Sequence, residues 1–401
     1  MNFYNFILDI LSIFLLPISN IWFPKEQRAN RRGLDLPKYK AVIWIHAASM
    51  GEVNAVKPFI LKLQRELPDE KIVISTMSKT GQAAAKQISE KISCFYLPLD
   101  TQPIMYITFR ALKPKLIIIA ETELWPNLLL RAKKKKIPVE IINGRISKKT
   151  FKTYLRTKFF WKKLIAEVHV NAKSRSDLKR FQKIGFKDVI NAGNLKFCLE
   201  LENYDRATTK RELGFSAGDK IIVWGSSRPG EEALLRDISA ELFEKITNLK
   251  LVIAPRHLNR VDEITEIFEQ VNLTSADNST AKINLVDEMG KLTKYYAIAD
   301  LAIIGGSFFD FGGHNPLEAA FYEIPTMIGN YHHSCGDSVR ILSKKKGIVI
   351  SNQEKLLVDI LNIFADAEKA KEIGANGKAA LVKNQTSMKI NLERSLEFLA
   401  R

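Results

Sequence analysis

Cysteine is scarce in this chain of 401 residues. Only Cys94, Cys198 and Cys335 are present, and none of them has the CxxC spacing. This excludes a disulfide scaffold and a structural zinc site, and it favours a reducing compartment. The six histidines form no HExxH motif, and no DxD pair follows a predicted strand. We therefore expect no metalloprotease, no bound metal and no cofactor.

Acidic residues are fewer than basic ones. The chain has 44 Asp and Glu against 61 Lys and Arg, which is a formal net charge of +17. An excess of this size indicates an anionic partner. The hydrophobic content of 46% and the charged content of 26% are typical of a globular protein and exclude a disordered chain. The length exceeds what one core organises, so we expect two domains.

Long apolar runs are missing, except at residues 3–23. Asp9 and Pro17 interrupt this run, and its polar residues share one narrow stripe at helical spacing, as in helices that lie in a membrane interface. Basic residues follow it at 25–32 and favour the cytoplasmic side for the rest of the chain. We expect residues 1–35 to be a membrane-associating segment, lying in or crossing the bilayer, although a buried helix has a similar pattern.

Most of the positive charge lies in one segment, residues 131–163. It contains thirteen Lys or Arg and a single acid, Glu140. Five aromatic residues are interleaved with them: Phe151, Tyr154, Phe159, Phe160 and Trp161. Such a segment fits anionic lipid headgroups or nucleic acid, or else a solvated helix face. The apolar N-terminus favours lipid.

Short apolar segments alternate with helical periodicity from residue 36 onward. Those of the first half cover residues 41–46, 71–76, 94–97, 116–120, 139–143, 168–171 and 189–192, and those of the second half cover 221–225, 251–254, 283–286, 301–305, 325–328 and 347–350. This alternation is typical of parallel sheets covered on both faces. We predict an α/β fold of two Rossmann-like doubly wound domains, 36–200 and 219–401, with a linker at 201–218. Ligands of such domains bind at the carboxyl ends of the strands.

Polar clusters follow several predicted strands of the first half. Glu52 falls in the first turn of a helix after the first strand, where it either complements the helix dipole or acts as a general base. Glu121 and Glu123 directly follow a fully apolar strand, where acids are costly unless they have partners or a function. Lys196 follows the last strand of this half. These positions predict a polar site at one sheet edge.

Glycine-rich turns follow the strands of the second half. They include residues 225–232 and 305–306, and a further pair of glycines precedes a helix start at Pro316. Free backbone amides and the helix dipole at such a start favour an anion such as a nucleotide phosphate. Glu318, in the first turn, is suited to accept hydrogen bonds from ribose hydroxyls.

Six motifs in order resemble those of the 3-deoxy-D-manno-octulosonic acid (Kdo) transferases: IHAASMGEV, ETELWPNL, NGRIS, NLKF, APRH and GGHNPLEAA. The resemblance covers nearly the whole chain. It implies a GT-B fold with an N-terminal membrane-associating helix, and transfer of Kdo from CMP-Kdo to the lipid A precursor of lipopolysaccharide (lipid IVA). It also implies a location at the cytoplasmic side of the inner membrane.

The resemblance assigns roles to individual residues. Glu52 matches the general base, and Glu121 and Lys196 match positions that support the transition state. The CMP contacts it implies are Pro255, Arg256, Met289, Gly290, Asn315, Pro316, Leu317 and Glu318. Lys291 stands where many relatives have Glu, so at that turn only the backbone part of the contact is expected. We expect Ser49, Gly51, Arg145, Lys148 and Lys149 on the side that faces the acceptor and the membrane.

The expected reaction is a displacement at the anomeric carbon with inversion, in which Arg256 and the helix start at Asn315 stabilise the departing phosphate without a metal. Two alternatives remain. Another GT-B nucleotide-sugar transferase or a 2-epimerase shares the architecture but does not account for the N-terminal run or ETELWP. A basic nucleic-acid-binding protein fits the charge, yet no nucleic-acid-binding motif is present, so we expect no such partner.

Overall fold

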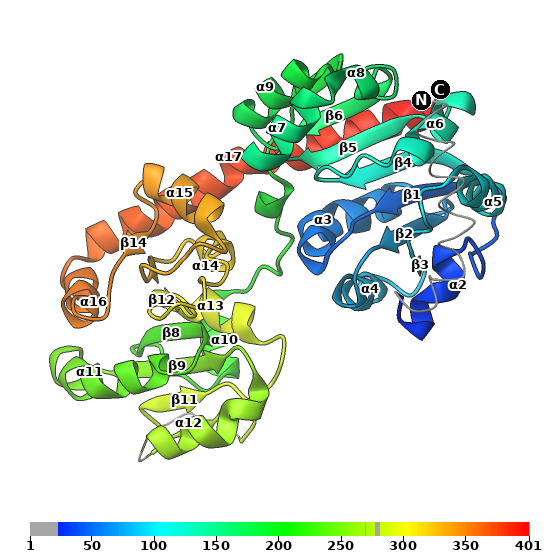
Figure 1. The fold of residues 1–401 in the computed structure, drawn as a ribbon. Helices are drawn as coiled ribbons and strands as arrows, with labels where there is room; N and C mark the ends of the chain where they lie inside the picture. Colours follow the sequence, from blue (N-terminus) through cyan, green and yellow to red (C-terminus); the bar gives the residue numbers. More distant parts are fainter. Residues whose placement is uncertain (1–22, 269, 277–280, 401) are drawn as a thin grey trace. The chain divides into compact units, whose positions relative to one another are not determined.

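The computed structural model describes residues 23–268, 270–276 and 281–400. Its described residues form two compact units, one within 23–198 with 384–400 and one within 199–383. Figure 1 shows that each unit is built on a sheet of its own with helices on both faces. The predicted membrane-associating run at 3–23 lies almost wholly outside the described residues. No helix of the described part combines the length and apolar character needed to cross a bilayer.

The first unit contains a seven-stranded parallel sheet in the order β3-β2-β1-β4-β5-β6-β7. Its strands are β1 (Val42–His46), β2 (Ile72–Thr76), β3 (Ser93–Tyr96), β4 (Pro114–Ala120), β5 (Val139–Gly144), β6 (Val168–Ala172) and β7 (Asp188–Asn191). Its helices are η1 (Lys25–Gln27), α2 (Arg28–Arg31), α3 (Met50–Glu66), α4 (Lys79–Lys86), α5 (Gln102–Leu112), α6 (Pro126–Lys134), α7 (Lys148–Arg156), α8 (Lys158–Trp161), α9 (Arg175–Ile184) and η2 (Leu195–Phe197). The predicted strands are confirmed.

The apolar runs of these strands serve two cores at once. Val42 and Trp44 of β1 pack into the core on one face of the sheet, while Ile43 and Ile45 pack into the core on the other. Successive side chains of a strand point to opposite faces, so a strand covered on both sides needs an uninterrupted apolar run. The residues that follow each strand are therefore the main candidates for polar chemistry.

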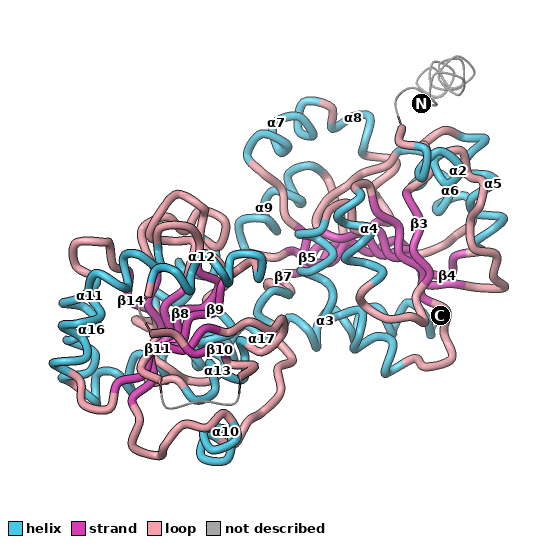
Figure 2. Tube along the Cα trace, turned by 90° about the horizontal axis from the view of Figure 1, so that it is seen from below, coloured by secondary structure: helices cyan, strands magenta, loops and turns pink. Residues whose placement is uncertain are grey.

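The second unit repeats this plan in the order β10-β11-β9-β8-β12-β13-β14, again fully parallel. Its strands are β8 (Lys220–Ser227), β9 (Leu249–Pro255), β10 (Asn272–Leu273), β11 (Ile283–Leu285), β12 (Leu301–Ile304), β13 (Thr326–Ile328) and β14 (Val349–Ile350). Its helices are α10 (Arg206–Glu212), α11 (Glu231–Lys245), η3 (Leu258–Arg260), α12 (Val261–Ile267), α13 (Leu292–Ile298), α14 (Leu317–Phe321), α15 (Gly336–Lys344), α16 (Leu356–Ala365) and the first part of α17 (Ala367–Ala400). The tube in Figure 2 shows the strands of both sheets between their covering helices. The short edge strand β10 was not predicted.

The domain boundaries differ from the predicted ones. The expected linker contains α10, which packs on α13 and is held by Arg206, whose guanidinium donates to the Ala299 carbonyl (2.8 Å) and pairs with Asp300 (2.8 Å). Residues 384–401, expected in the second domain, belong to the first unit. There Leu392 and Phe398 of α17 join the core formed by β1 and α3. Apolar residues in a long charged helix do not reveal which sheet they cover.

A buried polar network also attaches the end of α17 to the first unit. The fully buried Glu140 carboxylate of β5 accepts hydrogen bonds from Asn171 (2.6 Å) and Ser395 (2.5 Å). Arg394 donates to the Asn171 side chain (3.0 Å) and forms an ion pair with Asp188. Burial raises the pKa of Glu140 to about 7 in spite of these partners. A buried carboxylate is costly unless its hydrogen bonds are satisfied. The Glu140 carboxylate therefore favours the position of α17 in which Ser395 donates to it.

Candidate active site

Each sheet changes direction at one place. From β1 the chain adds β2 and β3 on one side and then returns to place β4 on the other, and β8, β9, β11 and β12 repeat the same course. In open parallel sheets the loops at such a switch point diverge and leave a crevice at the carboxyl ends of the strands. The residues that follow β1 and β4, and those that follow β8 and β12, are therefore the candidates for binding and chemistry.

Glu52 lies in the first turn of α3, directly after β1. Ser49 is the N-cap of this helix, and its hydroxyl oxygen accepts the Glu52 N–H (3.3 Å). The Glu52 carboxylate accepts hydrogen bonds from the Ala48 N–H (2.8 Å) and from the Ser49 hydroxyl (3.1 Å). This arrangement is a variant of the capping box, because the Glu52 carboxylate accepts the N–H of Ala48, one residue before the N-cap, and it fixes the carboxylate in one orientation. Glu52 thus stabilises the start of α3 and also lies at the switch point, where it is available for chemistry. The neighbouring Gly51 is exposed.

Three acids come together at this edge. Burial is the main cause that raises the pKa of Glu52, and the nearby charges of Glu123 and Glu121 raise it further, against the hydrogen bonds from Ala48 and Ser49. A higher pKa makes the carboxylate a better proton acceptor. The sequence motifs after β1 and β4 are therefore adjacent in the fold.

Glu121 has an unusual backbone conformation. Its φ is +56°, in the left-handed region that a residue with a Cβ seldom adopts. The backbone is held by the Glu121 N–H, which donates to the Ile142 carbonyl (3.0 Å). Within the described ranges, no hydrogen bond or ion pair engages the Glu121 carboxylate. Strain of this kind persists where the surrounding structure enforces it, and it is frequent at functional sites.

The second acid of this loop has partners that the sequence did not reveal. The Glu123 carboxylate lies 2.8 Å from Nε2 of the fully buried His46 and accepts a hydrogen bond from the Trp125 indole (3.2 Å). Nδ1 of His46 lies 2.9 Å from the Ser75 hydroxyl. A histidine at the end of an apolar strand is the only sequence signal for this network. It holds the Glu121–Trp125 loop against β1 and β2.

Lys196 reaches this part of the unit through a turn. It lies in η2, after the edge strand β7, and η2 packs against α3. The turn is fixed by Asn143 and Asn194, whose side-chain oxygens accept the Leu195 N–H (3.2 Å) and the Lys196 N–H (3.1 Å). Lys196 itself is exposed. The fold therefore brings a cation from the last strand of the sheet back to the helix that carries Glu52.

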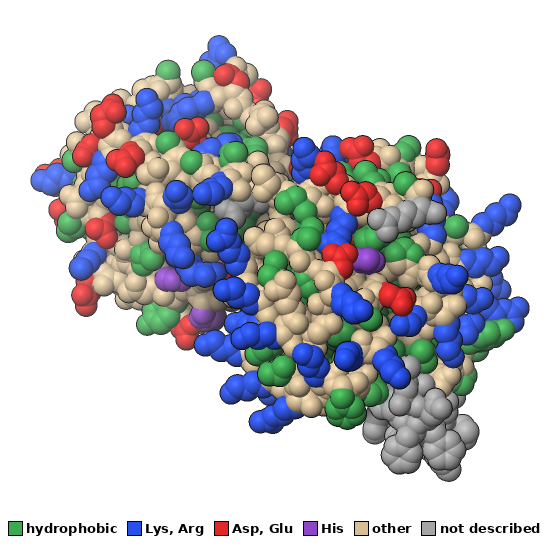
Figure 3. Space-filling view, turned by 90° about the horizontal axis from the view of Figure 1, so that it is seen from above, with side chains coloured by type: hydrophobic (Ala, Val, Ile, Leu, Met, Phe, Trp, Pro, Cys, Tyr) green, Lys and Arg blue, Asp and Glu red, His purple; other side chains and the backbone are tan. Residues whose placement is uncertain are grey.

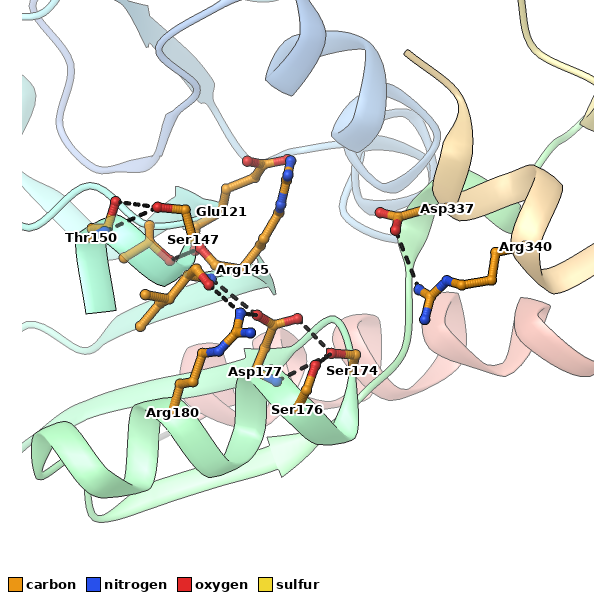
Figure 4. A network of polar contacts seen from close by, with 12 residues as sticks. Glu121, Arg145, Ser147, Thr150, Ser174, Ser176, Asp177, Arg180, Asp337 and Arg340 are labelled. Carbon is orange, nitrogen blue, oxygen red and sulfur yellow. Dashed lines mark hydrogen bonds and ion pairs between the residues drawn. The ribbon is translucent and has the colours of Figure 1, made fainter. Parts of the chain in front are cut away.

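The loop after β5 leads into α7 and is held by hydrogen bonds to α9. The Ile146 N–H donates to Asp177 (3.1 Å), and Arg180 donates to the Ile146 carbonyl (2.5 Å), as Figure 4 shows. Ser147 is the N-cap of α7. The predicted acceptor-side residues Arg145, Lys148 and Lys149 are all exposed. The hydroxyl of Thr122 donates to the Arg145 carbonyl (2.7 Å), which joins this loop to the acidic one.

The basic segment forms a surface, but its aromatic residues do not. The exposed cations between the end of α6 and the end of α8 are Lys134, Lys135, Lys136, Arg145, Lys148, Lys149, Lys152, Arg156, Lys158, Lys162 and Lys163. Phe151, Tyr154, Phe160 and Trp161 pack against the core, so these four aromatic side chains are not available to a membrane or a nucleic acid. Phe159 is the exception, 83% exposed beside the half-exposed Leu155. Figure 3 shows how widely Lys and Arg are spread over the visible face.

Cations dominate the corresponding edge of the second unit. Ser227 at the end of β8 and Pro255 at the end of β9 are register partners, and the next residues are Arg228 and Arg256. The Arg256 N–H donates to the Ser227 carbonyl (3.1 Å). Burial, together with the nearby Arg256, Arg228 and His257, lowers the pKa of His314 to about 4. The two arginines therefore provide the charge, and His314 is neutral at physiological pH.

The helix start after β12 adds polar groups to these cations. The Asn315 side chain accepts the Leu317 N–H (3.3 Å) at the start of α14, which Pro316 precedes. Burial raises the pKa of Glu318, while the nearby Arg256 and a hydrogen bond with Asn315 lower it. Arg256, Asn315 and Glu318, which the sequence placed in one site, are therefore close in the fold.

The backbone amides of the glycine turn after β12 are engaged within the protein. The N–H groups of Gly306 (2.8 Å), Ser307 (2.9 Å) and Phe308 (3.0 Å) all donate to the buried Glu231 carboxylate, which also accepts the Arg228 N–H (3.0 Å). This nest of amides already holds an internal anion and is not open to a phosphate. Its effect is to fix the turn that lies between Arg228 and His314.

The Met289–Lys291 turn follows β11 and is open to solvent. Met289 is 66% exposed, Gly290 has a φ of +82°, and a Cβ added to Gly290 would meet nothing within 4 Å. Lys291 forms a long ion pair with Glu288 (3.8 Å), so this turn carries charges of both signs. Among the described side chains, no group of three or more His, Cys, Asp or Glu could hold a metal ion.

Comparisons with known proteins identify the family of this chain. A family described as 3-deoxy-D-manno-octulosonic-acid transferase (kdotransferase) matches residues 23–199. The chain is 31% identical over 374 residues to the 3-deoxy-D-manno-octulosonic acid transferase of Chlamydia muridarum. The match covers 89% of this chain and 86% of that protein. The chain is 34% identical over 356 residues to a bifunctional glycosyltransferase/methyltransferase of Fusobacterium nucleatum; the match covers 84% of this chain and spans 55% of that longer protein.

A solved structure supports the fold. The crystal structure of a glycosyltransferase from Rickettsia africae ESF-5 matches with a TM-score of 0.55 and 13% identity, and it covers 90% of this chain and 99% of that one. At this identity the likeness concerns the fold alone, a GT-B-like pair of Rossmann-type units.

Proposed function

This chain belongs to the 3-deoxy-D-manno-octulosonic acid (Kdo) transferase family, and we propose that it moves Kdo from CMP-Kdo to lipid IVA in lipopolysaccharide biosynthesis. The observation that carries this proposal is the Glu52 carboxylate, oriented by a capping box at the switch point of the first sheet beside two further acids. The reaction takes place at the cytoplasmic face of the inner membrane.

Glu52 acts as the general base. The acceptor hydroxyl attacks the anomeric carbon of Kdo, its proton passes to the Glu52 carboxylate, and the bond from that carbon to the phosphate oxygen breaks so that CMP leaves. A single displacement inverts the configuration at the anomeric carbon. The raised pKa of Glu52 supports this role, because it increases the affinity of the carboxylate for the proton.

Glu121 and Lys196 support the transition state. Positive charge develops on the sugar ring in an oxocarbenium-like transition state, and an ionised carboxylate such as Glu121 stabilises it. Its left-handed backbone and unengaged carboxylate agree with this role. Lys196 supplies positive charge for the anionic groups of the reactants.

The second unit holds the donor. Arg256 binds the phosphate, and Pro255, Met289, Gly290, Lys291 and the Asn315–Glu318 turn contact the nucleotide. CMP has one phosphate, so side-chain cations are sufficient to stabilise its departure, and we propose that no metal and no cofactor takes part. Transfer in excess EDTA at the wild-type rate is the expected result, and a loss restored by a divalent ion would contradict it.

The membrane side comprises the N-terminal run and the basic surface of α6–α8. Its exposed cations suit an anionic inner-membrane surface, and Phe159 is positioned to enter the interface. The acceptor, which has phosphates and acyl chains, is met at that surface.

The decisive experiment is incubation of the purified protein with CMP-Kdo and tetraacylated lipid A precursor, followed by mass spectrometry of the lipid. We expect a product heavier by one or more Kdo residues, and their number is read directly from the mass. Calorimetry with CMP and UDP tests the alternative, because a preference for UDP would indicate another nucleotide-sugar enzyme and contradict the proposal.

A further inference from the structure

Neither the motifs nor the proposed mechanism assigns a role to Arg228, a cation at the basic edge of the second sheet. It follows β8, the central strand of the second sheet, and its Cζ lies 4.6 Å from the centre of the Phe311 ring. Stacking on an aromatic face keeps a guanidinium oriented without neutralising it. Arg228 is therefore a positioned charge.

The hydrogen-bonding capacity of this strand end is incompletely used. Nε of Arg228 and Oγ of Ser227 are buried and have no hydrogen-bond partner in the described part of the chain. Ser227 is only 1% exposed. Nor does any acid of the described residues form an ion pair with Arg228. Buried polar atoms without partners are uncommon in native proteins, and one explanation is a ligand that supplies the missing acceptors.

The second arginine of the pair differs in this respect. Glu318 lies close enough to Arg256 that their charges interact, so the Arg256 charge is partly balanced within the protein. The Glu231 carboxylate beside Arg228 is already occupied by the four backbone N–H groups described above. The edge thus keeps a cation that forms no ion pair with the described residues, in addition to the one assigned to the phosphate.

The positions of the two arginines correspond to the chemistry of the donor. Arg228 and Arg256 directly follow the register partners Ser227 and Pro255 on adjacent parallel strands, which lie about 4.8 Å apart. Kdo is a sugar acid whose anomeric carbon carries both its carboxylate and, in CMP-Kdo, the phosphate oxygen. Two anions that share one carbon require two neighbouring cations.

We propose that Arg228 binds the carboxylate of the donor sugar and selects an acidic sugar over a neutral one. This inference rests on the proposed function, since it takes CMP-Kdo as the donor. The guanidinium fork matches a carboxylate with two parallel hydrogen bonds, and the contact with the Phe311 ring holds the guanidinium in place. Gly306 leaves room for this arrangement, because a Cβ there would lie 3.3 Å from Cγ of Arg228 and 2.9 Å from Cδ2 of His314.

The test measures binding of three ligands by calorimetry without acceptor: CMP, CMP-Kdo, and a CMP-Kdo analogue whose carboxylate is replaced by a carboxamide. For Arg228→Gln we expect an affinity for CMP-Kdo about 10- to 100-fold lower than that of the wild type, since hydrogen bonds to charged groups contribute about 1.5–3 kcal/mol. The affinity for CMP and for the carboxamide should change less than about twofold. Arg228→Lys keeps the positive charge but lacks the guanidinium fork, so its affinity for CMP-Kdo should lie between that of the wild type and that of Arg228→Gln.

Arg236→Gln is the matched control, because Arg236 is exposed on α11 and pairs only with its neighbour Asp237. It should bind all three ligands as the wild type does. Equal weakening of CMP and CMP-Kdo in Arg228→Gln would show that Arg228 serves the phosphate or the fold, and unchanged binding of CMP-Kdo would show that it serves neither; both results overturn the inference and leave the proposed function intact. A wild-type protein that binds CMP but not CMP-Kdo would overturn the proposed function itself.

Discussion

The two Rossmann-like units share a topology and differ in the charge of their switch points. In both, the chain adds strands on one side of a first strand and then returns to the other side, so the critical loops follow β1 and β4 in one unit and β8 and β12 in the other. The first pair of loops brings together Glu52, Glu121 and Glu123. The second brings Arg228 and Arg256 to a neutral His314. Topology thus determines where a site lies, and a few strand-end residues determine its chemistry.

This difference corresponds to a division of labour in the proposed reaction. An acidic edge suits proton removal and a developing positive charge, and a basic edge suits an anionic donor. Exchanging or deleting charges at one edge should therefore affect one function and leave the other unchanged.

The largest expected effect comes from the acidic edge. Glu52→Gln should lower the rate of Kdo transfer by about 10²- to 10⁴-fold, which is typical of the loss of a general base, while CMP-Kdo binding persists. Gln also suits this position of a capping box, so α3 should remain folded. Transfer is measured by mass spectrometry. Glu66→Gln at the other end of α3 is the control, and near-normal transfer by Glu52→Gln would remove the base assignment.

The basic surface of the first unit should determine membrane binding. Replacing Lys148, Lys149 and Lys152 with Gln should weaken co-sedimentation with anionic vesicles by about 1 kcal/mol for each lysine, and added salt should reduce the difference. The equally exposed Lys344, Lys345 and Lys346 of the second unit, changed in the same way, are the control. If both triple variants lose the same affinity for anionic vesicles, the basic surface of the first unit has no special role in membrane binding.

At the basic edge, Arg256→Gln should lower the affinity for CMP about 10- to 100-fold, because a charged hydrogen-bond partner of the phosphate is lost. Calorimetry with CMP alone measures this effect without catalysis. Arg340→Gln provides the comparison, since Arg340 is exposed and pairs within α15 (Figure 4). Weakened CMP binding in Glu52→Gln but not in Arg256→Gln would reverse the assignment of the two edges.

The smallest effect concerns the attachment of α17 to the first unit. Burial raises the pKa of Glu140 to about 7, against its partners Ser395, Arg394 and Asn171, so its contribution to stability is complete below the ordinary value of 4.5 and decreases as pH rises through 7. One pKa unit corresponds to about 1.4 kcal/mol, so we expect a loss on the order of 1–3 kcal/mol between pH 5 and pH 8. Urea denaturation followed at both pH values measures it.

Glu140→Gln cannot ionise and should remove this pH dependence, whereas Glu397→Gln, exposed on the same helix, should retain it. A loss of stability between pH 5 and pH 8 that persists in Glu140→Gln would contradict the assignment of this effect to Glu140.

Much of the fold was predictable from the sequence, because strands buried on both faces need continuous apolar runs. For the same reason, the residues at strand ends stood out as candidates, and the geometry brings Glu52 to Glu121 and Arg256 to Glu318. The roles of these residues in catalysis and donor binding stay predictions. His46 and Arg228 were missed as participants, since a single polar residue after a strand does not show which loop it will meet.

Three features of the structure could not be foreseen from the sequence, for one physical reason. The aromatic residues of the basic segment pack inward, the amides of the Gly306 turn are occupied by Glu231, and the end of α17 belongs to the first unit. In each case the local pattern was interpreted correctly, but its partner is distant in sequence. Glu231, for example, is separated from Gly306 by 75 residues.

The sequence by itself determined the two parallel sheets, the places where each strand ends, and the sign of the charge in each loop, because these depend on local residue type and periodicity. Only the tertiary structure decided which loops meet, which carboxylates already have partners, and which sheet the last helix covers. These depend on contacts between segments far apart in the chain, where burial and hydrogen-bond satisfaction, rather than local preference, select the arrangement.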